Sequence, residues 1–144
     1  MSETRAIPLA SDRNPVTGRQ AMVCDETESV WLYLTDVDGR ELIADCWLFN
    51  TISAPDNLSG FANSGRPSPA IARFAAADAR RGLPAASEMS IAWSPDGHDA
   101  CVLMAGVPIG FIDSRHRRGF SRHLLAEGPW GQPFDEPTYK ALFE

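Results

Sequence analysis

The sequence lacks the features that would tie a short chain to a membrane, a secretion route or a disulfide framework. Lysine occurs once, as Lys140, and the three cysteines, Cys24, Cys46 and Cys101, form no Cys-x-x-Cys pair. An odd number of widely spaced cysteines favours reduced, buried thiols, which are typical of the cytosol. No apolar run approaches the ~18 residues of a membrane span, and no basic-then-apolar leader is present. We therefore expect a cytoplasmic protein that does not cross a membrane.

Signatures of catalysis and metal binding are also missing. The sequence contains no G-x-S-x-G, H-x-H or H-E-x-x-H, and its three histidines are His98, His116 and His123. A zinc site needs at least three convergent ligands, and a catalytic acid or base needs a partner within reach. We therefore expect no metal, no other cofactor and no catalytic residues, and a non-enzyme is favoured over an enzyme.

Length and charge limit the class of partner. The chain has 144 residues, the length of one domain, and a formal net charge of −6. An acidic protein is repelled by nucleic-acid phosphates and by acidic lipid headgroups. The sequence predicts no nucleic-acid and no membrane partner, which leaves another protein, a second copy of the chain or a small molecule.

The pattern that is present is mainly that of β-strands. Residues 88–113 contain three short strands of alternating polarity, joined by a Ser-Pro-Asp-Gly turn and an Ala-Gly turn. Residues 20–24, 30–35 and 41–49 indicate three more strands, the last two joined by an Asp-Gly turn, and 120–125 indicates a further one. The predicted fold class is α+β, dominated by an antiparallel meander of roughly six or seven strands.

Two helices are expected beside this sheet. Apolar residues recur at helical spacing after Ser68, and Gly82 can end the segment, which predicts one inserted helix over 68–81. Asp135 is a suitable cap for a short helix that ends near Phe143.

The remaining segments set the predicted domain boundaries. Residues 1–19 are polar and contain two prolines, which predicts a flexible N-terminal arm, with 20–144 as a single α+β domain. Residues 51–66 are rich in Ser, Asn and Gly and predict a long loop.

Two stretches resemble a known family. Residues 87–120 carry W-S-x-D-G, then Gly-x-Pro, Phe-x-Asp and a Gly-Phe pair, and residues 23–50 carry an acidic turn, an aromatic strand and a strand that ends in Asn50. Over about 60 of the 144 residues the chain resembles a group of small bacterial proteins catalogued as a domain of unknown function, DUF2251. It departs from that pattern by Ala105 in the second turn and by a longer insert at 51–86. The resemblance implies no activity, and an immunity-type role, in which the protein binds a toxin, follows by analogy only.

The candidate binding residues form a basic cluster after the meander. The cluster consists of Arg115, Arg117, Arg118, Arg122 and His123, together with His116. Arginine suits bidentate contacts with a carboxylate or a phosphate, so the cluster fits an acidic partner, a phosphate or a chain terminus. The alternative is a solvated turn whose charges pair with the acids of the protein itself.

Asp45 and Trp130 are two further candidate binding residues. Asp45 interrupts an apolar strand on the face of Ile43 and Trp47, so either that face is wet or Asp45 pairs with another group, most simply an arginine. Trp130 lies in an irregular Gly-Pro-Trp-Gly segment, where it is either an exposed anchor for a partner or a cover for the sheet edge.

Three functional hypotheses follow. The first is a non-catalytic protein-binding module, immunity-type or regulatory, whose surface combines the 51–66 loop, the 115–123 cluster and Trp130. The second is a small-molecule binder or enzyme with a pocket between the sheet and the 68–81 helix, where Asp45 would meet Arg73 or His123. The third is a homodimer formed through a sheet edge or face.

Overall fold

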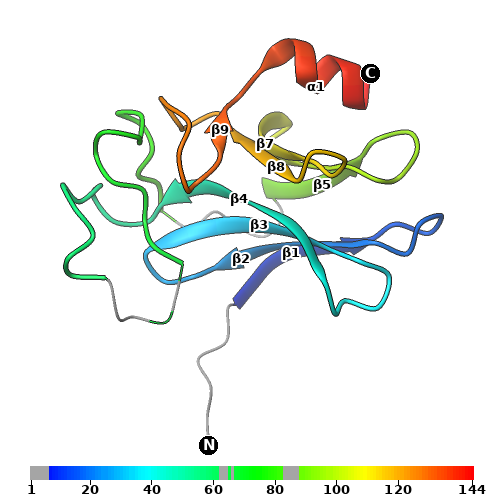
Figure 1. Cartoon of the computed structure of the whole chain (residues 1–144), viewed down its shortest axis with the longest axis horizontal. Coiled ribbons are helices and arrows are strands. Elements are labelled where there is room, and N and C mark those ends of the chain that lie inside the picture. Colours follow the sequence, from blue (N-terminus) through cyan, green and yellow to red (C-terminus); the bar gives the residue numbers. More distant parts are fainter. Residues whose placement is uncertain (1–6, 62–64, 66, 83–87) are drawn as a thin grey trace, which may run out of the picture.

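The computed structural model describes residues 7–61, 65, 67–82 and 88–144. Within these residues nine strands form two stacked sheets, and one helix follows the last strand (Figure 1). The strands are β1 (Ile7–Arg13), β2 (Gln20–Asp25), β3 (Ser29–Thr35), β4 (Leu42–Asn50), β5 (Met89–Trp93), β6 (Ala100–Met104), β7 (Val107–Asp113), β8 (Arg118–Ser121) and β9 (Gln132–Pro133). The helix is α1 (Glu136–Phe143).

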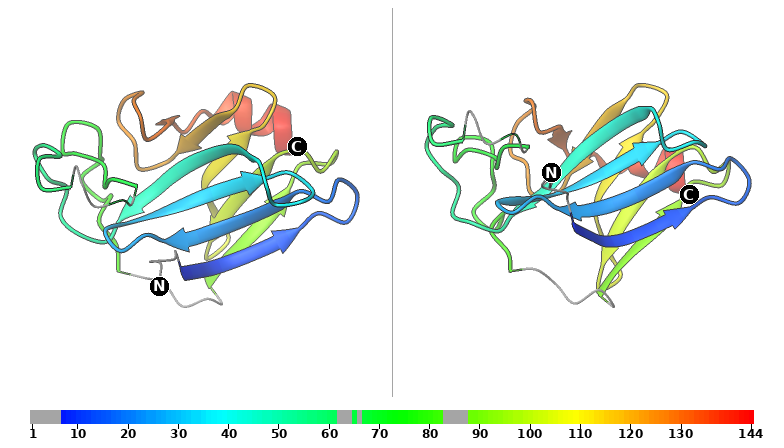
Figure 2. Two further views of the ribbon diagram at one scale, coloured as in Figure 1. Left: turned by 60° about the horizontal axis from the view of Figure 1, so that its bottom comes forward. Right: turned by 90° about the horizontal axis from the view of Figure 1, so that it is seen from below.

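Each sheet follows the order of the chain. The N-terminal sheet has the order β1-β2-β3-β4 with antiparallel neighbours, and the C-terminal sheet has the order β5-β6-β7-β8-β9 (Figure 2). Only the β8–β9 pair is parallel among the described strands. The strand predictions for 20–50 and 88–113 are therefore confirmed, but the prediction of one meander of six or seven strands is wrong. The connection after Asn50 leaves the first sheet instead of turning back along it.

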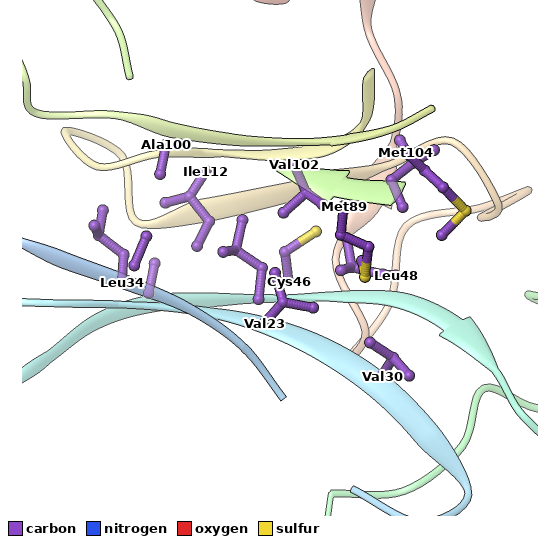
Figure 3. Packing of buried hydrophobic residues seen from close by; sticks show 14 of the residues in the cluster. Val23, Val30, Leu34, Cys46, Leu48, Met89, Ala100, Val102, Met104 and Ile112 are labelled. Carbon is purple, nitrogen blue, oxygen red and sulfur yellow. The ribbon is translucent and has the colours of Figure 1, made fainter. Parts of the chain in front are cut away.

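The main core lies between the two sheets (Figure 3). Val23, Leu34 and Leu48 of the N-terminal sheet face Val102 and Ile112 of the C-terminal sheet, and all five side chains are fully buried. Burial of a side chain of this size stabilises the fold by about 1.5–3 kcal/mol.

Two bulges in β4 change which of its residues enter this core. The pairing with β3 skips Leu48 and Ile43, because Val30 opposes Phe49 while Trp31 opposes Trp47, and Thr35 opposes Leu42 while Leu34 opposes Ala44. As a result Ile43 and Phe49 join the core between the sheets, although simple alternation places them with Trp47 on the other face.

Two glycines let β4 lie directly against β7 and β8. A methyl group added at Gly110 would lie 2.4 Å from Leu48 Cδ2, and one at Gly119 would lie 2.5 Å from the carbonyl oxygen of Asp45. At Gly119 the obstacle is main chain, so the close contact requires glycine there, whereas a side chain at Gly110 would force the buried Leu48 side chain to shift. On the far side of the sandwich Trp93 Nε1 donates a 2.7 Å hydrogen bond to Asp12 Oδ2, which links β5 to β1.

The segment after β4 covers the outer face of the N-terminal sheet. Its apolar residues pack on Trp31 and Trp47. The buried side chain of Asn50 holds it, because Oδ1 accepts hydrogen bonds from Trp47 Nε1 at 2.9 Å and from Ala70 N at 3.0 Å, while Nδ2 donates to Ala70 O at 2.9 Å.

The predicted inserted helix over 68–81 does not form, and this prediction is wrong. The segment consists of turns and isolated bridges. Its main-chain groups are bonded elsewhere: Ala76 N donates to His123 O, Phe74 O accepts from Leu125 N, and Ala79 O accepts from Asn50 N. Because distant strands and loops satisfy these groups, the local helical spacing of apolar residues does not decide the structure.

The C-terminal helix is confirmed. Asp135 is its N-cap, and its side chain accepts a 3.0 Å hydrogen bond from Thr138 N. α1 lies on the outer face of the C-terminal sheet, where Tyr139 and Phe143 pack around the buried ring of Phe111 (Figure 1).

The predicted flexible arm is corrected in part. Ile7–Arg13 is a strand that pairs with β2, so the ordered sheet begins well before residue 20, while residues 1–6 lie outside the described part. In the described part of the chain, no helix is long and apolar enough to cross a membrane.

The contact between β4 and β8 gives a test of the sandwich. Gly119→Ala places a methyl group against the main chain of Asp45 and Cys46, so we expect it to lower the free energy of unfolding by about 1–3 kcal/mol. Gly60→Ala is the control, because a methyl group there meets no atom within 4 Å. Urea denaturation followed by circular dichroism measures both, and equal stabilities of the two variants would contradict the close contact.

Candidate functional site

Four hairpin turns gather at one end of the sandwich, which we call the turn end (Figures 1 and 2). The turn end comprises residues 14–19, 36–41, 94–99 and 114–117, which join β1–β2, β3–β4, β5–β6 and β7–β8. In a sheet of successive hairpins alternate turns fall at the same end, and the stacking of the two sheets brings the two pairs of turns together.

Side-chain hydrogen bonds tie these turns to one another. Thr17 Oγ1 donates to the carbonyl of Gly97 at 2.9 Å, and Arg19 Nη1 donates to the carbonyl of His98 at 2.8 Å. Within the C-terminal sheet the buried carboxylate of Asp99 accepts a 2.8 Å hydrogen bond from Ser114 N. Three of the four turns are therefore fixed relative to one another before any partner arrives.

The W-S-P-D-G segment is one of these turns. Asp96 Oδ1 accepts hydrogen bonds from Ser94 Oγ at 2.7 Å and from His98 N at 3.1 Å. Both bonds favour the ionised carboxylate and lower the pKa of Asp96. The motif is a structural turn in which His98 is exposed.

A hollow of about 490 Å³ opens between the turn end and α1. Arg19, Asp113, Arg115 and His116 line it, and Leu142 of α1 forms one wall. Asp113 is nearly buried, and its Oδ2 lies 2.8 Å from His116 Nδ1, while the His116 side chain is 59% exposed. Of these two side chains, His116 is therefore the one that solvent or a partner can reach.

Of the predicted basic cluster, Arg115, His116 and Arg117 lie in the turn end, and Arg118 follows directly after it. Arg115 and Arg117 lie in the β7–β8 turn, and Arg118 begins β8. The guanidinium groups of Arg115 and Arg118 make no hydrogen bond or ion pair with a described residue, and Arg117 Nη1 donates only a long 3.5 Å bond to Ile43 O.

Arg122, His123 and Trp130 lie elsewhere. Arg122 stacks on Phe134 at 4.0 Å from the ring centre and pairs with Glu136 at 3.5 Å. His123 and Trp130 are both 4% exposed, so neither can act as a surface anchor. Arg122, His123 and Trp130 lie outside the turn end because the four residues of β8 carry the chain about 13 Å away from the turn.

The two buried residues of this group have structural partners. His123 Nδ1 donates to the carbonyl of Leu48 at 3.0 Å, and burial lowers the pKa of the ring. Trp130 Nε1 donates to Ser68 O at 3.1 Å, and its ring packs on Phe74. Of the two alternatives for Trp130, the structure has the cover over the sheet.

Asp45 lies in a second, smaller hollow of about 200 Å³. Arg117, Arg118 and Gly119 share this hollow, but no described cation comes within ion-pair distance of the Asp45 carboxylate. Partial burial raises the pKa of Asp45. Arg73 and His123 do not line the hollow, so the constellation that would meet at a sheet–helix pocket does not assemble.

The thiols and the remaining buried acid offer little chemistry. Burial raises the pKa of Cys24 to about 11 and of Cys101 to about 12, and it raises the pKa of Cys46 further. Glu26 is buried and accepts a short hydrogen bond from the Tyr33 hydroxyl. Among the described residues, no three His, Cys, Asp or Glu side chains converge as a metal site.

The residues that the sequence left out of the site are those supplied by other parts of the fold. Arg19 and Asp99 come from two other turns, Asp113 ends β7 beside the basic turn, and Leu142 comes from α1. The alternation of hairpin turns along the chain was the available signal for Arg19 and Asp99, because it predicts which turns share an end.

Comparison with known proteins adds no identification: no family model, no curated protein and no solved structure matches the chain. The resemblance to the DUF2251 group therefore stays a prediction.

Thiol reactivity tests the inert role of the cysteines. We expect Cys24, Cys46 and Cys101 to resist Ellman's reagent in the native protein near pH ~8, since burial and raised pKa values suppress the thiolate. The same protein in ~6 M guanidinium should release all three thiols. Rapid labelling of one thiol in the folded protein would identify a reactive cysteine and contradict this assignment.

The role of His123 can be tested by pH. Because its pKa is lowered in the folded state, the unfolded state binds more protons as the pH falls below the ordinary value of about 6.5. The free energy of unfolding should then decrease as the pH is lowered through this range, and His123→Gln should flatten that dependence. His98→Gln, at an exposed turn histidine, is the control. Urea unfolding at several pH values measures the slopes, and an unchanged slope in His123→Gln would count against a buried neutral histidine.

Proposed function

We propose that the protein is a non-catalytic binding module that holds an acidic protein partner at the turn end. An immunity-type protein and a regulatory protein are both forms of such a module. The observation that carries the proposal is the set of arginines at this end whose guanidinium groups have no partner among the described residues.

Three of the five acids of the turn end, together with Asp113 beside it, are already engaged, and the other two, Asp38 and Glu41, are exposed and form no ion pair with the described arginines. Asp36 accepts hydrogen bonds from the main-chain N–H groups of Asp38 and Arg40, and Asp96 accepts from Ser94. Asp99 and Asp113 are held by Ser114 N and by His116. These carboxylates stabilise the turns themselves, so they do not neutralise the arginines through direct contacts.

The arginines are the groups left for a partner. Arg40 and Arg115 are exposed on two different turns, and the exposed Arg118 begins β8 directly after the turn of Arg115. Guanidinium forks bind carboxylates in pairs of parallel hydrogen bonds, which gives both orientation and affinity. Because hydrogen bonds fix the turn of Arg115 relative to two of the other turns, little main-chain freedom is lost there when a partner binds.

The turn end also replaces the larger surface that the sequence predicts. The segment after Asn50 begins at the opposite end of β4 from the 36–41 turn (Figure 1). Trp130 is buried. The proposed surface therefore contains the basic turn and its three neighbouring turns, without the 51–66 loop.

The test is affinity capture from the organism that carries the gene, with a variant in which two turns have reversed charge. We expect the wild type to recover a protein with an acidic surface and Arg40→Glu/Arg115→Glu to recover at least about tenfold less of it. Salt of about 0.5 M should also release the partner, since exposed charges are screened.

Arg73→Glu/Arg80→Glu is the matched control, because it makes the same change of charge at two exposed arginines away from the turn end. Light scattering on each variant reports any homodimer. A partner that is lost equally from both double variants, or that resists salt, would refute binding at the turn end, as would a stable dimer without a foreign partner.

A further inference from the structure

The contact between α1 and the C-terminal sheet is incomplete. Tyr139, Leu142 and Phe143 pack on the aromatic cluster around Phe111, yet none of the helix residues is buried. A helix that covers the apolar face of a sheet normally buries a stripe of its own residues. This helix instead leaves space between itself and the strands.

That space is a groove of about 460 Å³ between α1 and the start of β8. Its apolar walls are Phe120 on the strand and Pro137, Ala141 and Leu142 on the helix. The volume lies in the range of small-molecule sites, and a largely apolar lining with a few polar groups is typical of them.

The polar residues that line the groove are Asp113, His116, Arg118 and Thr138, and Arg118 alone among them has no side-chain partner among the described residues. Asp113 also reaches the groove, but its Oδ2 lies 2.8 Å from His116 Nδ1, and its Oδ1 accepts from His116 N at 3.4 Å. The Thr138 hydroxyl donates to Asp135. Arg118 lines the same groove, as well as the hollow beside Asp45, and its guanidinium has no hydrogen-bond or ion-pair partner among the described residues.

We infer that this groove binds a small amphipathic carboxylate, with an aryl or alkyl body between Phe120 and α1 and its carboxylate on Arg118. Apolar walls favour the body, and the guanidinium fork matches the planar carboxylate. The groove shares Arg118 with the proposed partner surface, but its apolar lining and α1 do not belong to that surface. It also moves the small-molecule alternative from the absent 68–81 helix to the terminal helix.

Isothermal titration with 4-phenylbutyrate and decanoate tests the groove. We expect at least one of them to bind, and the corresponding uncharged alcohol to bind at least about tenfold more weakly, since a hydrogen bond to a charged group is lost. Arg118→Gln should weaken carboxylate binding by a similar factor, and Arg40→Gln, on an exposed arginine of another turn, should leave it unchanged.

Ala141→Trp fills the groove from the exposed side of α1 and should abolish binding without preventing folding. If that variant does not fold, Arg118→Gln still decides. Absence of binding by both carboxylates at millimolar concentration, or equal binding of acid and alcohol, would overturn the inference. Tighter binding of a short peptide that ends in Phe would also overturn it in favour of a peptide terminus.

The two proposals fail in different experiments. Ala141→Trp leaves the arginines of the turn end in place, so partner capture should persist when the groove is filled. Arg40→Glu/Arg115→Glu leaves the lining of the groove intact, so titration with the carboxylate should be unaffected.

Discussion

The direct contact of β4 with β7 and β8 is the constraint on which the rest of the structure depends. Two packed sheets are ordinarily held about 10 Å apart by the side chains between them. At Gly110 and Gly119 there are none, so Leu48 and the main chain at Asp45 and Cys46 meet the opposite sheet. Cys46 Sγ lies 3.3 Å from the carbonyl of Phe120, which places the buried thiol inside this joint. At this edge the two sheets therefore pack directly against each other.

This joint determines what lies at each end of the molecule. In one direction β4 and β8 lead to the turns 36–41 and 114–117, so Arg117 reaches the carbonyl of Ile43 and the charged turns become neighbours. In the other direction β4 ends at Asn50, whose side chain holds the covering segment at Ala70. The proposed binding surface and the covering segment are therefore separated by the length of one strand. α1 lies outside the C-terminal sheet (Figure 1). The groove lies between this helix and Phe120.

Some elements follow from the local sequence, and others depend on contacts with distant residues. The Asp-Gly turn at Gly39, the Ser-Pro-Asp-Gly turn and the cap at Asp135 were predictable, because each depends on residues within one turn of the chain. The segment 68–81 has the apolar spacing of a helix, but its main-chain groups bond to Asn50, His123 and Leu125. The buried position of Trp130 has the same origin, since Ser68 and Phe74 come from that segment. Of the candidate site, the sequence pointed to the basic turn but not to the other three turns beside it.

The sequence by itself determined the strands, their tight turns, the terminal helix and the lack of catalytic spacing, because alternation and turn preference act over a few residues. Only the tertiary structure decided that these strands form two sheets, that four turns meet, and that His123 and Trp130 are buried while Arg115 and Arg118 are not. Those outcomes depend on main-chain contacts between residues far apart in the chain. The closest of them exist because two positions, Gly110 and Gly119, carry no side chain.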